Sequence, residues 1–227
     1  MTLIELARGP GLTFALAVFV LGTLWRLVGV LRLPRLRDLS PAREAAPSAL
    51  IAVVRANLRA MWPRPAYAPF TLWVTINGYV FHIGLALVFF GYAPHISFIR
   101  RILGFGWPAL PDIVMVVAAS ATLIAMLMAL ATRLTDPVRK KISSADDFIS
   151  WTVTFLPLFT GMAVMGEPSA AILARSHVVY GGPLAMHLLS LELLLVWFPF
   201  GKLMHALLFA FSRGATGLRF SHRGVEA

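Results

Sequence analysis

Residues 186–205 read MHLLSLELLLVWFPFGKLMH, and only Glu192 and Lys202 among them carry a formal charge when histidine is neutral. The stretch lies inside a longer apolar segment that runs from about Pro183 to Phe211. A helix of about 20 apolar residues crosses the hydrocarbon core of a bilayer. The segment therefore predicts a membrane-spanning helix, and its two histidines are unusual residues for such a place.

Four earlier segments have the same character, at about residues 10–31, 70–93, 111–132 and 148–166. Apolar residues make up 59% of the 227-residue chain and charged residues 13%, against roughly 45–50% and about 25% in soluble domains. Arg26 and Arg32 follow the first apolar run where a signal peptide would need small residues for cleavage, so we expect a retained helix. The sequence predicts an all-α integral membrane bundle of five transmembrane helices, forming a single domain over residues 1–227.

The basic residues predict how this bundle is oriented. The chain has 20 Lys and Arg against 10 Asp and Glu, a net charge of +10. With the N-terminus outside and the C-terminus in the cytoplasm, 16 of the 20 cations lie on the inner side, and the outer side holds four, Arg8, Arg100, Arg101 and Arg175. Cytoplasmic loops of membrane proteins carry such an excess of Lys and Arg. The positive charge therefore indicates membrane topology and not a nucleic-acid partner.

The predicted inner loop, residues 34–69, contains an amphipathic helix from Ser48 to Trp62. The Ser48 hydroxyl can accept from a free backbone N–H and cap the helix. Its apolar face comprises Leu50, Ile51, Val54, Leu58 and Met61, and arginines lie elsewhere. Two interpretations are open: the helix lies on anionic lipid headgroups, or it docks a cytoplasmic partner subunit.

Four of the six histidines fall in or just beyond two of the segments. His82 and His95 belong to the second, and His187 and His205 to the fifth; His177 and His222 lie in a connection and the tail. His187 and His205 are 18 residues apart, which in one helix places them on one stripe about 27 Å apart, and the 13 residues from His82 to His95 rise about 20 Å. Because these helices run antiparallel, we expect His82 to pair with His205 and His95 with His187, each pair holding one haem.

Three glycines, Gly78, Gly91 and Gly201, each lie four residues before one of these histidines. In a helix they would share its face and admit the edge of a porphyrin, although glycine also serves helix packing. The chain has no cysteine, so any iron–sulfur centre that exchanges electrons with it belongs to another chain.

The fifth segment resembles the last helix of the gamma subunit of respiratory nitrate reductase. The shared features are two histidines 18 residues apart and the ending PF-x-[KR]-x-x-H, here Pro199, Phe200, Lys202 and His205, and FHIG at 81–84 resembles the family's first histidine motif. The resemblance implies a five-helix, dihaem b-type cytochrome of a bacterial or archaeal cytoplasmic membrane. It would exchange electrons between quinone and an iron–sulfur subunit, with a catalytic subunit also on the cytoplasmic side. Related members serve sulfur-cycle complexes, so no terminal substrate is implied.

One position departs from the family pattern. The family's second histidine follows the first by about ten residues, where this chain has Tyr92, and His95 comes three residues later, directly after Pro94. In an unbroken helix, His95 would point about 140° away from His82. Three alternatives are open: His95 is a ligand because Pro94 ends the helix, Tyr92 is the ligand, or only His82 and His205 hold a haem.

Four charged residues near the histidines have two interpretations each. Lys202 would pair with a haem propionate or extend to the interface, and Arg100 and Arg101 would serve the outer propionates or a quinone headgroup, or be plain loop cations. Glu192 would belong to a proton path or make a hydrogen bond to a neighbouring helix. The competing class is a haem-free transporter or structural anchor, in which the histidines only bridge helices.

Overall fold

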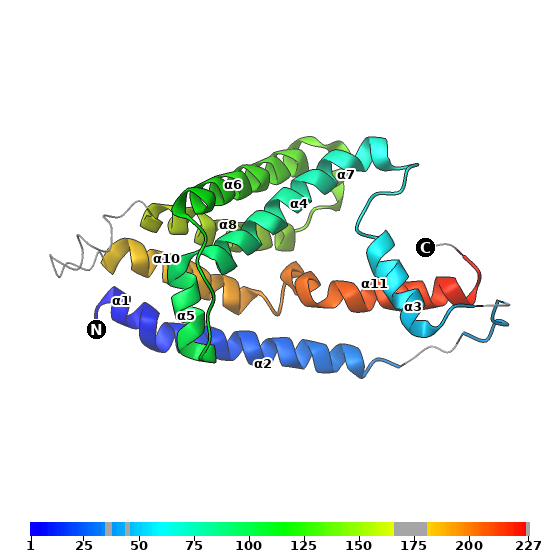
Figure 1. Ribbon diagram of the computed structural model, residues 1–227, viewed down its shortest axis with the longest axis horizontal. Coiled ribbons are helices and arrows are strands. Elements are labelled where there is room, and N and C mark those ends of the chain that lie inside the picture. The colour runs from blue at the N-terminus through cyan, green and yellow to red at the C-terminus, as the bar shows by residue number, and fades with distance from the viewer. Residues whose placement is uncertain (35–37, 44–45, 166–180, 226–227) are drawn as a thin grey trace.

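The computed structural model describes residues 1–34, 38–43, 46–165 and 181–225, and in these residues the chain is helical with no strand (Figure 1). The elements are α1 (Leu3–Leu6), the π-turn η1 (Ala7–Gly11), α2 (Leu12–Leu31), α3 (Ala49–Arg59), α4 (Ala68–Gly91), α5 (Ala93–Leu103), α6 (Asp112–Thr135), α7 (Pro137–Ile142), α8 (Ala145–Met165), α10 (Gly181–Trp197), the 3₁₀ turn η2 (Lys202–Met204) and α11 (His205–His222).

Several of these helices are long and apolar enough to cross a membrane, which indicates a multi-pass membrane protein. Four described helical stretches qualify by themselves: Leu3–Leu31, Ala68–Gly91, Asp112–Thr135 and Ala145–Met165. A fifth span arises if the bent pair Gly181–Trp197 and Lys202–His222 is taken together. The prediction of an all-helical membrane bundle is confirmed at this level. The predicted end of the fourth segment, Gly166, lies outside the described residues.

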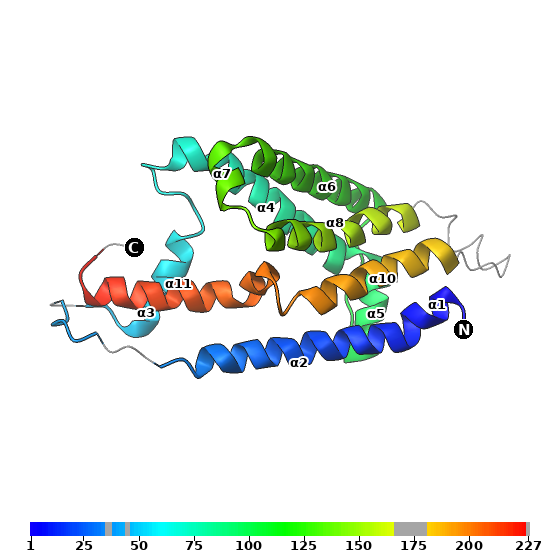
Figure 2. The same ribbon diagram turned by 180° about the vertical axis from the view of Figure 1, so that it is seen from behind.

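The spanning helices pack as a row, with α4 against α6, α6 against α8, α8 against α10, and α10 against α2 (Figures 1 and 2). Close approach and hydrogen bonds hold helices together in lipid, where there is no hydrophobic drive between them. The Asn77 amide of α4 donates to the Ala125 carbonyl of α6 at 2.9 Å, and the Trp151 indole of α8 donates to the Met126 carbonyl at 2.9 Å. Large apolar side chains such as Phe70, 80% exposed, cover the outer surface, as lipid contact requires.

The predicted amphipathic helix is present as α3, although it ends at Arg59 and not at Trp62. Its cap is confirmed, because the Ser48 hydroxyl accepts from the Ile51 N–H at 3.4 Å. A different face from the predicted apolar one makes its tertiary contact. Ala52 and Ala56 are buried against Gly217 of α11. The predicted apolar face is exposed. Both interpretations of this helix, contact with lipid and docking of a partner subunit, therefore stay predictions.

The predicted fifth helix is not continuous, and this prediction from 183 to 211 is wrong. Helix α10 ends at Trp197, the axis turns by 79°, and helical structure resumes at Lys202. Pro199, whose side chain is fully buried, has no N–H to donate to the preceding turn. Gly201 then adopts extended backbone at φ −100° and ψ −173°. His187 and His205 therefore lie on two different helices and share no stripe.

The α4–α6 crossing generates a prediction for Gly84. A Cβ there would collide with the Thr122 hydroxyl and lie 3.2 Å from the Ala118 carbonyl oxygen. We expect Gly84→Ala to lower the free energy of unfolding by about 1–3 kcal/mol, as overpacking does. Gly29→Ala is the matched control, because nothing lies within 4 Å of a Cβ there. Reversible unfolding in detergent micelles measures both variants, and equal stability of the two would show that close packing at Gly84 does not stabilise the fold.

Candidate functional site

Four histidine side chains from four elements form two close pairs. The ring centres of His82, on α4, and His205, the first residue of α11, lie 6.1 Å apart with the rings nearly perpendicular. The ring centres of His95, on α5, and His187, on α10, lie 6.2 Å apart with the rings within 16° of parallel. These are the two pairs that the antiparallel arrangement predicts. The His82–His205 pair is exposed, and the His95–His187 pair is half-buried.

A helix break positions His95. Helix α4 ends at Gly91, Tyr92 takes an extended conformation at φ −82° and ψ 128°, and α5 begins at Ala93 with Pro94 in its first turn. Proline fits a first helical turn because the N–H it lacks would have no helical partner there. His95 therefore lies in a new helix, and the 140° mismatch of an unbroken helix does not arise. The Tyr92 ring lies edge-on to His95, with ring centres 5.4 Å apart.

The Nδ1 atom of each imidazole is already engaged. It lies 2.7 Å from the Gly78 carbonyl oxygen in His82, 2.8 Å from that of Lys202 in His205, and 3.1 Å from that of Val88 in His95. A carbonyl can only accept, so Nδ1 carries the proton and donates in these three rings, which leaves the Nε2 lone pair free. Metal-binding histidines are typically oriented in this way.

His187 is held by helix α8. Its Nδ1 lies 3.3 Å from the Thr160 hydroxyl, which donates to the Leu156 carbonyl at 2.7 Å and so can accept from the ring. A Cβ at Gly161 would lie 3.2 Å from Cε1 of His187, so a larger residue would crowd the ring. The contact of Thr160 and Gly161 with His187 could not be predicted from the sequence, because no sequence pattern indicates which face of α8 meets His187.

The donor set and spacing fit a haem iron bound between each pair. Two metal–imidazole bonds of about 2 Å, with roughly 1.2 Å from each nitrogen to its ring centre, would separate the ring centres by about 6.4 Å, close to the 6.1 and 6.2 Å of the two pairs. Among the described residues there is no group of three or more His, Asp or Glu side chains that could hold a metal ion. A metal held by only two protein ligands needs a further ligand set, which a porphyrin supplies.

The three glycines have different surroundings. Nothing lies within 4 Å of a Cβ at Gly78, and its carbonyl accepts from His82. A Cβ at Gly91 would lie 2.7 Å from Leu110 and 3.0 Å from Met115, and one at Gly201 would collide with Trp197 and lie 2.9 Å from Asp146. Neighbouring protein atoms therefore account for the absence of a side chain at Gly91 and Gly201, whereas Gly78 leaves open space beside a histidine.

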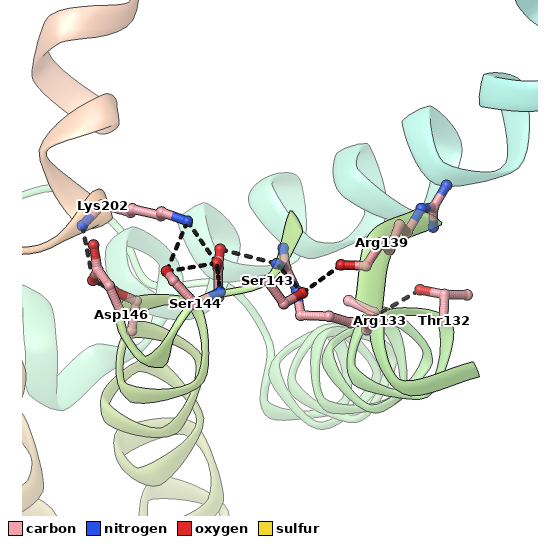
Figure 3. Close-up of polar contacts among 10 residues, drawn as sticks. Thr132, Arg133, Arg139, Ser143, Ser144, Asp146 and Lys202 are labelled. Carbon is pink, nitrogen blue, oxygen red and sulfur yellow. Dashed lines mark hydrogen bonds and ion pairs between the residues drawn. The ribbon is translucent and has the colours of Figure 1, made fainter. Parts of the chain in front are cut away.

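Lys202 takes part in an ion cluster with Asp147 and Arg133 at the break between α10 and α11. Its Nζ lies 2.5 Å from Asp147 Oδ2 and within reach of the Ser144 hydroxyl, and Asp147 Oδ1 lies 2.9 Å from the Arg133 guanidinium (Figure 3). The Lys202 backbone N–H also donates to Asp146 at 3.2 Å. The Lys202 ammonium therefore already has an anionic partner, and binding a haem propionate would mean sharing or losing this ion pair. These contacts tie α6, α8 and the residues just before His205 together.

A cavity of about 520 Å³ opens between α5 and the loop that follows it. Its lining includes Ala93, Ile96, Ser97, Arg100 and Trp107, and His95 is not among the lining residues. Arg101 is not part of the lining and is exposed in the last turn of α5. Of the two candidate arginines, only Arg100 is thus associated with a space that could admit a small molecule.

Glu192 is buried on α10, 8% exposed, and faces the N-terminal segment. A Cβ at Gly11 would lie 2.6 Å from Glu192 Oε2. Its Oε1 has no hydrogen-bond partner in the part of the chain that the structure describes. No hydrogen bond from Oε1 to a neighbouring helix is therefore seen. A role of this carboxyl in a proton path stays a prediction.

The chain resembles a curated protein of Nitratidesulfovibrio vulgaris (strain Hildenborough) whose description reads only "Protein". The two are 30% identical over 219 residues, which cover 94% of this chain and 91% of the relative. The chain belongs to the same family as this protein. No family model matches the sequence, and no solved structure matches it. Similarity over nearly the whole length of both chains thus shows the family.

The ion cluster generates a prediction for Asp147, whose side chain is 8% exposed. We expect Asp147→Asn to lower the free energy of unfolding by about 1–3 kcal/mol, because Lys202 and Arg133 lose their common counter-ion but remain partly solvated. Asp136→Asn is the matched control: Asp136 caps α7 through the Val138 N–H at 2.8 Å, and asparagine keeps a capping oxygen. Thermal unfolding in micelles compares the two, and a larger loss at Asp136 would contradict this assignment.

Proposed function

We propose that this protein is the membrane-anchor, b-type cytochrome subunit of a respiratory oxidoreductase complex. It exchanges electrons between the quinone pool and a cytoplasmic iron–sulfur partner, and it holds two haems b, one between His82 and His205 and the other between His95 and His187. The observation that carries the proposal is the occurrence of two histidine pairs with ring centres 6.1 and 6.2 Å apart. Each ring has its Nδ1 engaged and its Nε2 free to bind iron.

The residues of the chain orient these ligands before any cofactor binds. The carbonyls of Gly78, Lys202 and Val88 and the hydroxyl of Thr160 fix the ring tautomers. When bound, haem supplies a one-electron redox centre whose potential depends on its axial ligands and surroundings. Helix α4 does not pack closely against α10 or α11. His82 on α4 and His205 on α11 therefore approach each other across two separated helices.

The distribution of cations supports the orientation, with the N-terminus outside and the C-terminus inside. In that orientation His82 and His205 lie toward the cytoplasm, together with α3 and α11. Because the chain has no cysteine, the iron–sulfur centre belongs to a partner subunit on that side, and a catalytic subunit completes the complex. A bacterial or archaeal cytoplasmic membrane is the proposed location, in line with the resemblance to the nitrate reductase gamma subunit.

Quinone is proposed to bind in the cavity between α5 and the loop that follows it. The cavity is large enough for a ring-sized headgroup, and Arg100 and Ser97 provide polar groups in an otherwise apolar and aromatic lining. Arg100 would donate hydrogen bonds to a quinone carbonyl, and Trp107 and Phe105 would contact the flat ring.

Haem counting tests the ligand assignment. We expect the purified wild-type chain to show a b-type α-band in its reduced-minus-oxidised spectrum, with two haems per chain. His205→Ala and His187→Ala should each keep one haem, since each removes a ligand of a different pair. His222→Ala is the matched control and should keep two.

Each other result of this experiment selects a different alternative. Two haems in His95→Ala together with a loss in Tyr92→Phe would identify Tyr92 as the ligand. One haem in the wild type, lost in His82→Ala, would identify a single-haem variant. The absence of any α-band would overturn the cytochrome proposal in favour of a haem-free transporter or structural anchor.

The quinone cavity generates a prediction for Arg100. We expect Arg100→Ala to raise the concentration of a soluble quinol analogue that gives half-maximal haem reduction by about 3–10-fold, with the limiting rate little changed, because a binding contact is lost. Stopped-flow absorbance at the α-band measures this. Arg101→Ala, which removes an exposed cation outside the cavity lining, should match the wild type, and an equal defect in both variants would indicate an electrostatic effect without a binding site.

A further inference from the structure

A second, smaller cavity lies where α3 crosses α11, at the end of the bundle away from the N-terminus (Figures 1 and 2). Its volume is about 90 Å³, and a water molecule occupies about 30 Å³ in the liquid, so there is room for a group of a few heavy atoms. The small residues Ala52, Ala56 and Gly217 form part of its wall, and three arginines, Arg43, Arg55 and Arg59, are also among the residues that line it.

The chain brings these arginines to one place by specific contacts. Arg55 and Arg59 are four residues apart on α3 and so share one side of the helix. Arg43 reaches the same place because its backbone N–H donates to the His222 carbonyl at 2.9 Å and its side chain lies against Gly224. The three arginines therefore give this cavity a cationic lining.

The carboxylate of Asp38, in the segment before Arg43, is engaged elsewhere. Its Oδ2 lies 2.8 Å from the Arg223 guanidinium, and its Oδ1 accepts from the Ser40 hydroxyl at 2.7 Å. These contacts hold the pKa of Asp38 well below its usual range, so it remains ionised and paired with Arg223. It is not part of the cavity lining, and in the described residues no ion pair joins Arg43 or Arg55 to a carboxylate.

An apolar surface lies beside this cationic cavity. On α3, Leu50, Ile51, Val54 and Leu58 are 72%, 53%, 47% and 64% exposed. At about 100° per residue, Ile51 is the neighbour of Arg55 around the helix, so the apolar face begins where the arginines end. Figure 1 shows α3 lying across α11 and not along it. A helix in this position, with arginines beside exposed apolar side chains, has the features of one that lies in the membrane interface.

We propose that the Arg43–Arg55–Arg59 cavity binds the phosphate of an anionic phospholipid, whose acyl chains cover the exposed apolar face of α3. Guanidinium groups bind phosphate oxygens through paired hydrogen bonds. A phosphate group would therefore suit both the arginines that line the cavity and the space for a few heavy atoms inside it. The adjacent apolar face distinguishes a lipid from free phosphate, because a free ion would leave that face uncovered. An acidic segment of a protein partner would supply the charge without acyl chains.

The experiment uses the full chain in nanodiscs of phosphatidylcholine, titrated with phosphatidylglycerol, and measures bound lipid by native mass spectrometry and the midpoint of thermal unfolding. We expect retention of phosphatidylglycerol and a rise in the midpoint, with at least tenfold weaker retention in the double variant R43Q/R55Q. R55Q alone serves if the double variant does not fold. R101Q, which removes an exposed arginine elsewhere, is the matched control and should behave as the wild type.

Further arms distinguish the possible ligands. Parallel titrations use inorganic phosphate and a soluble polyglutamate peptide. An equal rise in the midpoint with inorganic phosphate would identify a free-phosphate site and overturn the lipid assignment. A response to polyglutamate in the absence of one to phosphatidylglycerol would indicate a protein partner. Equal lipid retention by the wild type and both arginine variants would overturn the proposal altogether. None of these measurements depends on haem or quinone.

Discussion

The ion cluster of Asp147 with Lys202 and Arg133 holds the point at which the last apolar segment changes direction. A backbone break inside a membrane protein exposes carbonyl and N–H groups that lipid cannot satisfy, so other protein groups must stabilise it. Here the Lys202 N–H donates to Asp146 and the lysine side chain pairs with Asp147. His205 follows three residues after Lys202, so the same cluster that stabilises the break also determines where this imidazole lies.

A second break has the same effect at the other pair. The α4 helix stops at Gly91 and α5 starts two residues later, which turns His95 toward His187. In both cases a proline near the break removes one backbone donor and leaves the histidine in the first turn of a new helix. The two pairs therefore depend on interrupted helices, and straight helices with the same residue spacing would not bring the rings together in this way.

Which histidine lies opposite which could be predicted from the sequence, because that assignment follows from antiparallel helix order and rise per residue. Directions around the helix could not be predicted, because they depend on where each helix stops. The surroundings of the glycines could not be predicted either. Their spacing placed Gly91 and Gly201 on the faces of the histidines, but Leu110, Met115 and Trp197 fill the space beside them. Nor could the partner of Lys202 be predicted, because Asp147 is 55 residues away in the chain and belongs to another helix.

The sequence by itself determined that the chain is an all-helical membrane protein, where its apolar segments lie and which residues are candidate ligands. Those properties follow from hydropathy and charge, which are summed along the chain. Only the tertiary structure decided that the last segment is bent by 79°, that all four ring nitrogens Nδ1 are engaged, and that arginines from separate segments line one cavity. These depend on contacts between residues far apart in sequence, whose geometry is set by packing and by the need to satisfy backbone groups at each helix break.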